Sequence, residues 1–271
     1  MASSSGVETT APPIAVVGGS GFYEFISDPT TVSVETPFGE PSAPVSVGDV
    51  AGRQVAFLPR HGRRHELAPH QVNYRANLWA LRSLGVRQVL APCAVGSLQP
   101  GLGPGALVVP DQLVDRTSGR VQTYYDTGAV HVPFADPYCP VLRAALCASD
   151  PAVVDGATMV VVEGPRFSTR AESTWYAGLG WSLVNMTGHP EAVLARELAL
   201  CYATVALVTD RDAGVSEGES VNQETVFAEF AKNIERLRAI LQRVVAGLSA
   251  DRSGCMCSSA LDGISLPTEL P

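Results

Sequence analysis

Short apolar runs rich in β-branched residues recur along this chain, and each ends at a glycine or a polar residue. Four of them are IAVVGG at 14–19, VLAPCAVG at 89–96, TMVVVEG at 158–164 and ATVALVTD at 203–210. Uninterrupted runs predict strands buried on both faces, because a strand with one face in water alternates apolar and polar residues. Segments with helical spacing follow several of these runs. The pattern therefore predicts an α/β fold in which helices flank a mixed central β-sheet.

The helical segments have recognisable ends. NYRANLWALRSLG places apolar residues at helical spacing and stops at Gly85, a typical C-terminal cap. We expect a disordered lead (1–13), one α/β domain (14–247) and a tail (248–271) that wraps the surface or ends in disorder. The expected elements are a strand and turn at 14–22, a hairpin with a Gly-Asp turn at 45–62, a helix at 73–85, strands at 89–94, 105–115 and 158–167, a helix from about Ser168, a strand, loop and helix at 183–200, a last strand at 203–214 and a helix at 223–247.

Charge and hydropathy narrow the class of function. The formal net charge of −8 gives the chain no overall attraction to nucleic acid or anionic membranes, so an anionic ligand must be held locally. No stretch approaches the roughly 20 apolar residues of a transmembrane helix. The first residues, MASSSGVETTAPP, lack the basic head and apolar centre of a secretory signal. Six scattered cysteines suit reduced thiols, so a cytoplasmic location is expected.

Cys255 and Cys257 lie close together in GCMCSS. This segment has neither the second cysteine pair nor the histidines of a zinc motif, so no metal site is expected. A polar tail with two exposed thiols is the interpretation favoured over a redox pair.

Two motifs that follow strands suit an anion. In GGSGF (18–22), consecutive glycines let backbone N–H groups point inward and Ser20 adds a hydroxyl. The spacing fits neither a Walker A loop nor a full dinucleotide fingerprint, so ATP and NAD are not expected. In PRHGRRH (59–65), Arg60 offers a planar fork for phosphate and His61 can add a further donor. A tight turn and a solvated basic loop are the alternatives.

TDRDAG places Asp210 and Asp212 two residues apart at the end of a strand, where extended geometry directs both to one side. Two carboxylates that share a site can have one pKa raised, which provides a protonated acid near neutral pH. An aspartate-rich turn is the alternative. Ligands of open α/β sheets bind where strand ends converge, so these acids and the anion motifs are expected over one crevice.

Seven motifs in order resemble the 5′-methylthioadenosine phosphorylases, a family within the trimeric purine nucleoside phosphorylase superfamily. They are GGSGF, PRHGRRH with NYRAN, CAVGSL, VVPDQLVDRT, EGPRFSTRAE, NMTGHPEAVLARE and TDRDAG, which together extend over about 14–245. The resemblance implies a nucleoside phosphorylase-like fold, a homotrimer, no cofactor, and inorganic phosphate as co-substrate. The implied reaction is phosphorolysis of 5′-methylthioadenosine, or of a related 5′-deoxy- or 5′-halo-5′-deoxyadenosine, to adenine and a 5-substituted ribose 1-phosphate.

The resemblance also implies roles for individual positions, with His131 reaching the 5′ substituent from the neighbouring subunit. It places Ser20, Arg60, His61, Cys93, Ala94 and Thr187 at phosphate, Met186 beneath the ribose, Phe167 against the purine, Asp210 and Asp212 at the base edge as the catalytic acids, and His65, His131, Gln223, Val226 and Phe227 around the 5′ substituent.

Departures from the family pattern leave alternatives open. Relatives specific for 6-oxopurines carry Asn at the Asp210 position, so adenine is expected over hypoxanthine, yet the TG-x-PEA pattern around His189 also occurs in those relatives. Cys93 stands where the family commonly has Thr. Gln223 and Phe227 make the 5′ wall more polar and partly aromatic, which suits a group smaller than methylthio. A 6-oxopurine nucleoside phosphorylase and a non-catalytic nucleoside-binding protein are the alternative functions.

Overall fold

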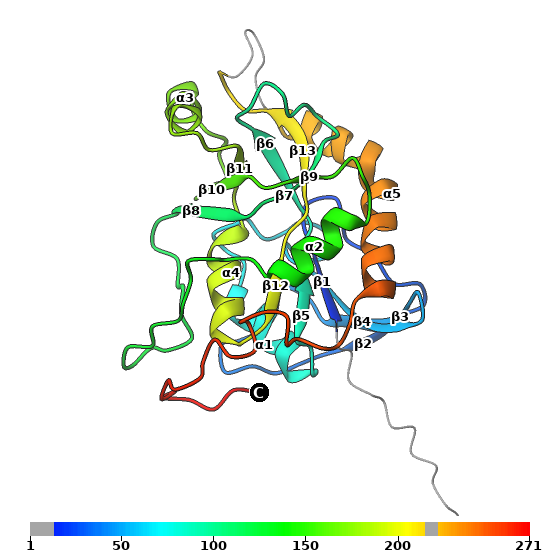
Figure 1. Cartoon of the computed structure of the whole chain (residues 1–271), viewed down its shortest axis with the longest axis vertical. Coiled ribbons are helices and arrows are strands. Elements are labelled where there is room, and N and C mark those ends of the chain that lie inside the picture. Colours follow the sequence, from blue (N-terminus) through cyan, green and yellow to red (C-terminus); the bar gives the residue numbers. More distant parts are fainter. Residues whose placement is uncertain (1–13, 215–221) are drawn as a thin grey trace, which may run out of the picture.

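The computed structural model of the chain describes residues 14–214 and 222–271 (Figure 1). The lead expected at 1–13 lies outside the described residues. Within the described ranges, no helix is long and apolar enough to cross a membrane. The strands are β1 (Ile14–Gly18), β2 (Thr30–Val32), β3 (Val45–Val50), β4 (Arg53–Pro59), β5 (Gln88–Leu90), β6 (Cys93–Ser97), β7 (Leu107–Val109), β8 (Gln112–Arg116), β9 (Val154–Asp155), β10 (Thr158–Val162), β11 (Leu183–Asn185), β12 (Cys201–Ala203) and β13 (Ala206–Arg211). The helices are α1 (Tyr74–Ser83), α2 (Pro140–Ala148), α3 (Arg170–Gly178), α4 (Gly188–Glu197) and α5 (Gln223–Gly247).

The strands form two mixed sheets. The first has the order β12-β5-β1-β4-β3-β2, and the second has the order β8-β10-β11-β6-β13-β7-β9. In the first sheet β1, β4, β5 and β12 run parallel. In the second sheet β6 pairs parallel with β13 and antiparallel with β11. The α/β class with mixed pairing is therefore confirmed, while the single central sheet that we expected is divided in two.

Helices cover both faces of the strands. Ala15 and Val17 of β1 belong to a core that includes residues of α1 and α4, whereas Ile14 and Val16 belong to a core that includes residues of α2 and α5. Successive side chains of a strand point to opposite faces, so β1 contributes to both cores. In Figure 1, α4 lies on one side of the strands and α5 on the other. Burial on both faces is the reason that these strands are continuously apolar in sequence.

Two of the expected strands are each interrupted by a proline. The run at 89–94 contains the end of β5 and the beginning of β6, which belong to different sheets, and Pro92 lies between them. The run at 105–115 contains β7 and β8, with Pro110 between them. A proline has no N–H to donate to a strand ladder, so the strand ends there.

The strand expected at 203–214 is also two strands, β12 and β13, although no proline separates them. The backbone N–H of Ala91 donates to Ala203 O, and that of Cys93 donates to Val205 O. The two segments therefore cross from the first sheet to the second side by side, because each supplies the hydrogen-bond partners of the other.

The expected hairpin at 45–62 is formed by β3 and β4, but the position of its turn differs. Ala51 and Gly52 make the turn, with φ of 53° and 79°, while Gly48 and Asp49 lie inside β3. Positive φ at both central residues matches the twist of the flanking strands in a tight hairpin.

Local capping explains where three helices begin and end. Asn73 accepts a hydrogen bond from the N–H of Ala76 at the start of α1, and Gly85 follows its end with φ of 84°. Thr169 and Glu172 form a capping box at α3, which begins close to the expected position. The bounds of α5 are those predicted from the sequence.

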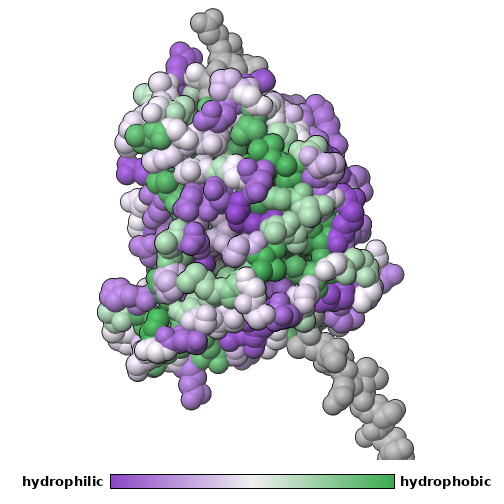
Figure 2. Space-filling view, in the orientation of Figure 1, coloured by the Kyte–Doolittle hydropathy of each residue, from purple (hydrophilic) through white to green (hydrophobic). Residues whose placement is uncertain are grey.

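Helix α2, β2 and β9 were not predicted, and the tail takes the first of its two expected forms, against the surface. Figure 2 shows apolar surface gathered over the region of α2. The tail lies against the molecule without forming a helix or strand, and Cys257 is only 1% exposed. Cys255 is half-buried. The interpretation of two exposed thiols is therefore wrong, because the tail packs its cysteines onto the core of α2 and α5.

Candidate active site

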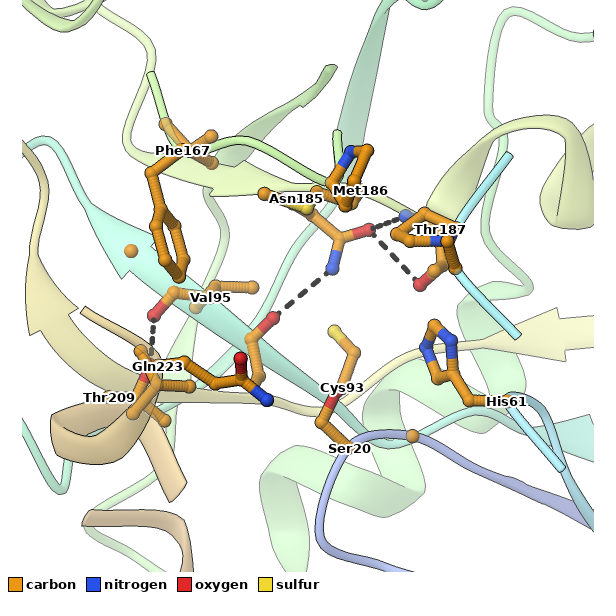
Figure 3. A pocket seen from close by; sticks show the side chains of 18 of the residues that line it. Ser20, His61, Cys93, Val95, Phe167, Asn185, Met186, Thr187, Thr209 and Gln223 are labelled. Atoms are coloured by element: carbon orange, nitrogen blue, oxygen red, sulfur yellow. Dashed lines mark hydrogen bonds between the residues drawn. The ribbon is translucent and has the colours of Figure 1, made fainter. Parts of the chain in front are cut away.

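One cavity of about 370 Å³ lies where β1, β4, β11 and β13 end, and β6 runs beside it (Figure 3). Every site residue that the sequence predicted lines this cavity except His131, which is exposed in the segment before α2. The residues brought together are Ser20, Arg60, His61, His65, Cys93, Ala94, Phe167, Met186, Thr187, Asp210, Asp212, Gln223, Val226 and Phe227.

Glycines let the turn after β1 approach the cavity closely. A Cβ atom on Gly19 would lie 2.9 Å from Arg60 Nη1 and 2.9 Å from Pro92 O. These separations are too short for a real Cβ, so the close approach requires glycine. The N–H of Phe22 donates to Gly19 O over 3.0 Å and closes the turn, which leaves Ser20 at the cavity wall.

Arg60 is 1% exposed and forms a buried ion pair with Glu191. Its Nε and Nη2 donate to the two carboxylate oxygens over 2.6 and 2.8 Å. Burial lowers the pKa of Arg60, but the charge of Glu191, its hydrogen bonds and smaller contributions from Tyr202 and Cys93 together outweigh burial, and the net shift is upward. The planar fork that the sequence suggested for phosphate is thus occupied by Glu191. Nη1 makes only a long 3.4 Å hydrogen bond to Pro92 O and retains N–H capacity for a ligand.

His61 is 4% exposed, and its Nδ1 lies 2.9 Å from Leu67 O. A carbonyl oxygen only accepts, so Nδ1 carries the proton in this contact. Burial, followed by the positive charge of Arg60, lowers the pKa of His61 to about 3. The ring is therefore neutral and its Nε2 is an acceptor. The sequence suggested that His61 would donate a hydrogen bond to an anion. In the structure its other ring nitrogen, Nε2, is a hydrogen-bond acceptor instead.

Asn185, which the sequence analysis did not single out, organises the wall beside Thr187. Its Oδ1 accepts from the N–H groups of Thr187 and Gly188 over 2.8 and 2.7 Å, and its Nδ2 donates to Ala94 O over 3.2 Å (Figure 3). Thr187 is the N-cap of α4, yet its side chain makes no capping hydrogen bond. Its hydroxyl has only a long 3.5 Å contact with Asn185 and remains able to donate to a ligand.

Cys93 lies at the same end of the cavity. Its Sγ is 3.4 Å from Thr204 Oγ1, and burial raises the pKa of the thiol. The side chain is therefore an uncharged thiol, which is a weaker donor than a hydroxyl.

Asp210 and Asp212 are at the other end of the cavity. A Cβ on Gly96 of β6 would lie 3.1 Å from Asp210 Oδ2 and 3.4 Å from Asp212 Cβ, so both aspartates lie on the side of this glycine. Arg211 between them lies near Gly103 instead. The prediction that the two carboxylates face the same side is confirmed.

Burial raises the pKa of Asp210 to about 6, opposed by the hydrogen bond from Thr209 and reinforced by the charge of Asp212. The Thr209 hydroxyl donates over 2.8 Å. Burial also raises the pKa of Asp212, whose Oδ1 accepts from the N–H of Ala213 over 2.7 Å. Asp210 thus carries a proton for part of the time near neutral pH, as the sequence predicted for one acid of this pair.

Phe167 and Met186 line the same cavity on different sides. Figure 3 shows the Phe167 ring on the side of Thr209, and Met186 beside Thr187. A Cβ on Gly164 would lie 2.6 Å from Met186 Sδ, so the absent side chain provides room for the thioether. Phe167 is 37% exposed, which places it at the open rim.

His65, Gln223, Val226 and Phe227 line one more part of the wall. The His65 ring stacks on His61 with centroids 4.5 Å apart and meets the Phe227 ring edge-on at 5.5 Å. Tyr23 OH lies 3.1 Å from His65 Nδ1. Burial lowers the pKa of His65. The rings of His65 and Phe227 make this wall partly aromatic, and its four side chains are uncharged. Gln223 adds one polar amide group to it.

Glu191 and Asn185 were missed because their importance depends on partners far away in sequence. Glu191 binds Arg60 and accepts from Tyr202 OH over 2.8 Å. A carboxylate within the otherwise apolar stretch PEAVLA was the available signal, since a buried charge needs a partner.

Known proteins resemble this chain along most of its length. The model of the phosphorylase superfamily matches residues 13–246. The chain is 62% identical to an S-methyl-5′-thioadenosine phosphorylase of Mycolicibacterium smegmatis, over 95% of this chain and 99% of that protein. It is 57% identical to a purine nucleoside phosphorylase of Streptomyces coelicolor, over 95% and 97% respectively. A methylthioadenosine phosphorylase from Schistosoma mansoni in complex with adenine has a TM-score of 0.85 and 38% identity, covering 89% of this chain and 93% of that one.

Proposed function

This chain belongs to the phosphorylase superfamily and, within it, to the S-methyl-5′-thioadenosine phosphorylases, and from that premise we propose how its cavity works. The protein is an enzyme that catalyses phosphorolysis of 5′-methylthioadenosine or a related 5′-modified adenosine. The bond between N9 of adenine and C1′ of the sugar breaks, and an oxygen of inorganic phosphate bonds to C1′. The products are adenine and a 5-substituted ribose 1-phosphate.

The observation that supports this mechanism best is the division of one cavity into two chemically different ends. Ser20, Thr187 and Arg60 Nη1 supply donors at one end, and Asp210 and Asp212 supply acids at the other. Cleavage develops positive charge on the ribose and negative charge on the purine. Phosphate at the first end stabilises the cation and then captures it, and an acid at the second end neutralises the base.

Phosphate is held mainly by uncharged donors in this proposal. Arg60 is neutralised by Glu191, so it contributes an oriented N–H group more than a free positive charge. The hydrogen phosphate dianion has one O–H group, and neutral His61 accepts from it through Nε2. That hydrogen bond orients the phosphate, and the proton stays on phosphate while the ester forms, because a phosphate monoester is a stronger base than an imidazole whose pKa is about 3.

Asp210 is the proton donor to the base. Its pKa of about 6 lets it hold a proton near neutral pH and give it to N7 as the bond to C1′ breaks. The purine gains one proton from Asp210, and Asp210 regains a proton from solvent as the ester product releases one there, so the reaction is balanced without any cofactor. Holding both substrates in one cavity removes much of the entropic barrier.

Asp210 also favours adenine over hypoxanthine. Its oxygen that carries no proton accepts from a 6-amino group and repels a 6-oxo group. A 6-oxopurine activity is the second candidate, since the relative from Streptomyces coelicolor has the broader name and protonated Asp210 can donate to a 6-oxo oxygen. Comparing kcat/KM for methylthioadenosine and methylthioinosine decides between them.

The aromatic wall formed by His65 and Phe227 surrounds the 5′ substituent in this proposal. The aromatic Phe227 and the polar Gln223 favour a group smaller than methylthio, such as hydrogen or halogen. Competition among methylthioadenosine, 5′-deoxyadenosine and 5′-chloro-5′-deoxyadenosine tests the preference. A kcat/KM highest for the methylthio compound overturns it.

We also propose that the enzyme is a homotrimer in which His131 completes the 5′ wall of the neighbouring subunit. His131 is exposed and lies outside the cavity of its own chain, which supports this assignment. Light scattering of the purified protein measures the oligomeric state. His131→Ala should raise KM for the nucleoside and leave KM for phosphate unchanged.

The direct test of the reaction is to incubate the protein with methylthioadenosine, with and without phosphate, and to measure free adenine. We expect adenine only when phosphate is present. Release of adenine and free sugar without phosphate would indicate a hydrolase, and binding without turnover in either condition would indicate a non-catalytic protein.

A further inference from the structure

Four cysteines that are distant in sequence converge away from the catalytic cavity. Cys139 is the N-cap of α2, Cys201 is the first residue of β12, and Cys255 and Cys257 belong to the tail. Their sulfur atoms all lie within 4.8 Å of one another. None of the four lines the catalytic cavity. We call this group the cysteine cluster.

The geometry of the cysteine cluster is close to that of a tetrahedral metal site. Zinc binds thiolate sulfur at about 2.3 Å, which places the sulfurs of a regular tetrahedron about 3.8 Å apart. The Cys201 and Cys255 sulfurs are already 3.5 Å apart, and no separation in the cluster exceeds the ideal by more than about 1 Å. Small rotations of the side chains therefore suffice to close a four-sulfur shell.

The surroundings of the cysteine cluster also suit a metal. Cys139, Cys201 and Cys257 are each about 1% exposed, so water would be excluded from the site. Four sulfur ligands with no oxygen or nitrogen ligand favour a soft tetrahedral ion over Mg²⁺ or Ca²⁺. Structural zinc sites are closed in this way by four protein ligands.

Positive charge lies beside the sulfurs. Arg252 Nε donates to Cys201 Sγ over 3.3 Å, and Arg252 Nη2 donates to Ala199 O. A divalent ion with four thiolates has a net charge of −2, which complements the Arg252 guanidinium.

We propose that Cys139, Cys201, Cys255 and Cys257 bind one structural Zn²⁺ ion, which anchors the tail to α2 and β12. In Figure 1 the red tail runs along the base of the molecule below β12 and α2. The tail has no strand or helix of its own, so the metal would supply the connection that a strand ladder supplies elsewhere. The site lies outside the catalytic cavity and takes no part in phosphorolysis.

The first test is the metal content of the full-length wild-type protein, purified under reducing conditions without a histidine tag. Plasma mass spectrometry should find one zinc per chain, and the thiols of the cysteine cluster should resist alkylation until a chelator is added. No zinc together with a mass that shows one or two disulfides would overturn the proposal. Four free, freely alkylated thiols without zinc would also overturn it, and iron in place of zinc would overturn the choice of ion.

Matched cysteine variants locate the site. Cys255→Ser/Cys257→Ser should lose the zinc, whereas Cys147→Ser, which changes a half-buried cysteine outside the cluster, should keep it. In wild type, Co²⁺ exchanged for zinc should give the visible absorption of a tetrahedral thiolate complex, and the double variant should not. Retention of full zinc by the double variant would refute the assignment, even if the wild type contains metal.

Discussion

The two ends of the catalytic cavity handle charge in opposite ways. At the phosphate end, Arg60 is already paired with Glu191 and His61 is neutral, so little uncompensated charge awaits the substrate. At the base end, Asp210 and Asp212 lie together, and burial raises the pKa of both. At the phosphate end, the ion pair fixes the side chain of Arg60 before substrate arrives. At the base end, burial lets Asp210 hold a proton, but burying this acid lowers the stability of the fold.

This contrast separates positioning from chemistry. A group held by a buried ion pair offers fixed N–H directions, which is what an incoming dianion needs for alignment. A carboxylic acid with a raised pKa offers a transferable proton, which is what a departing purine needs. Changes at the phosphate end should therefore affect stability and KM for phosphate, and changes at the base end should affect turnover.

The largest effect is expected for Asp210→Asn. Loss of the proton donor should lower kcat/KM for methylthioadenosine by roughly 10²- to 10⁴-fold, the usual contribution of a general acid. The ratio of methylthioinosine to methylthioadenosine activity should rise, because an amide can donate to a 6-oxo group. Steady-state kinetics with both nucleosides measures this. Asp28→Asn, an exposed position outside the cavity, is the control, and equal losses in both variants would contradict the assignment.

Glu191→Gln should destabilise the fold by about 3–5 kcal/mol, because it leaves the buried guanidinium of Arg60 without its counter-ion. Urea unfolding measures the loss. A neutral double variant, Arg60→Met/Glu191→Gln, should be more stable than Glu191→Gln alone. If Glu191→Gln unfolds at the wild-type urea concentration, the ion pair does not organise the phosphate end.

The same Asp210→Asn substitution should stabilise the fold above pH 6. The folded-state pKa of about 6 exceeds the ordinary value of 3.8, so the stabilising contribution of the protonated acid is complete below pH 3.8 and is lost as pH rises through 6. The shift corresponds to at most about 3 kcal/mol. Urea unfolding at pH 4.5 and pH 8 should show a larger gain for the variant at pH 8. A gain independent of pH would show that Asp210 is not protonated in this range.

The smallest effect is expected for Cys93→Thr. A hydroxyl is a stronger donor than the buried thiol, so KM for phosphate should fall roughly 2- to 10-fold, equivalent to one ordinary hydrogen bond. Cys93→Val, similar in shape but without a donor, is the matched control. Equal KM values for the two variants would show that this position does not contact phosphate.

The sequence alone determined which segments are buried strands, the bounds of α5 and the motifs that line the cavity. Local residue patterns suffice for this, because they predict which segments are buried and where helices begin and end. Ser20, Arg60, Asp210 and Asp212 could be identified from such patterns, and their meeting in one cavity from the rule that strand ends converge. The division into two sheets, the pairing of Arg60 with Glu191 and the acceptor role of His61 came only from the tertiary structure. So did the meeting of Cys139 and Cys201 with the tail cysteines. Each of these depends on which residue, distant in sequence, supplies a hydrogen bond or a charge. The spacing of residues along the chain does not predict which residue that is.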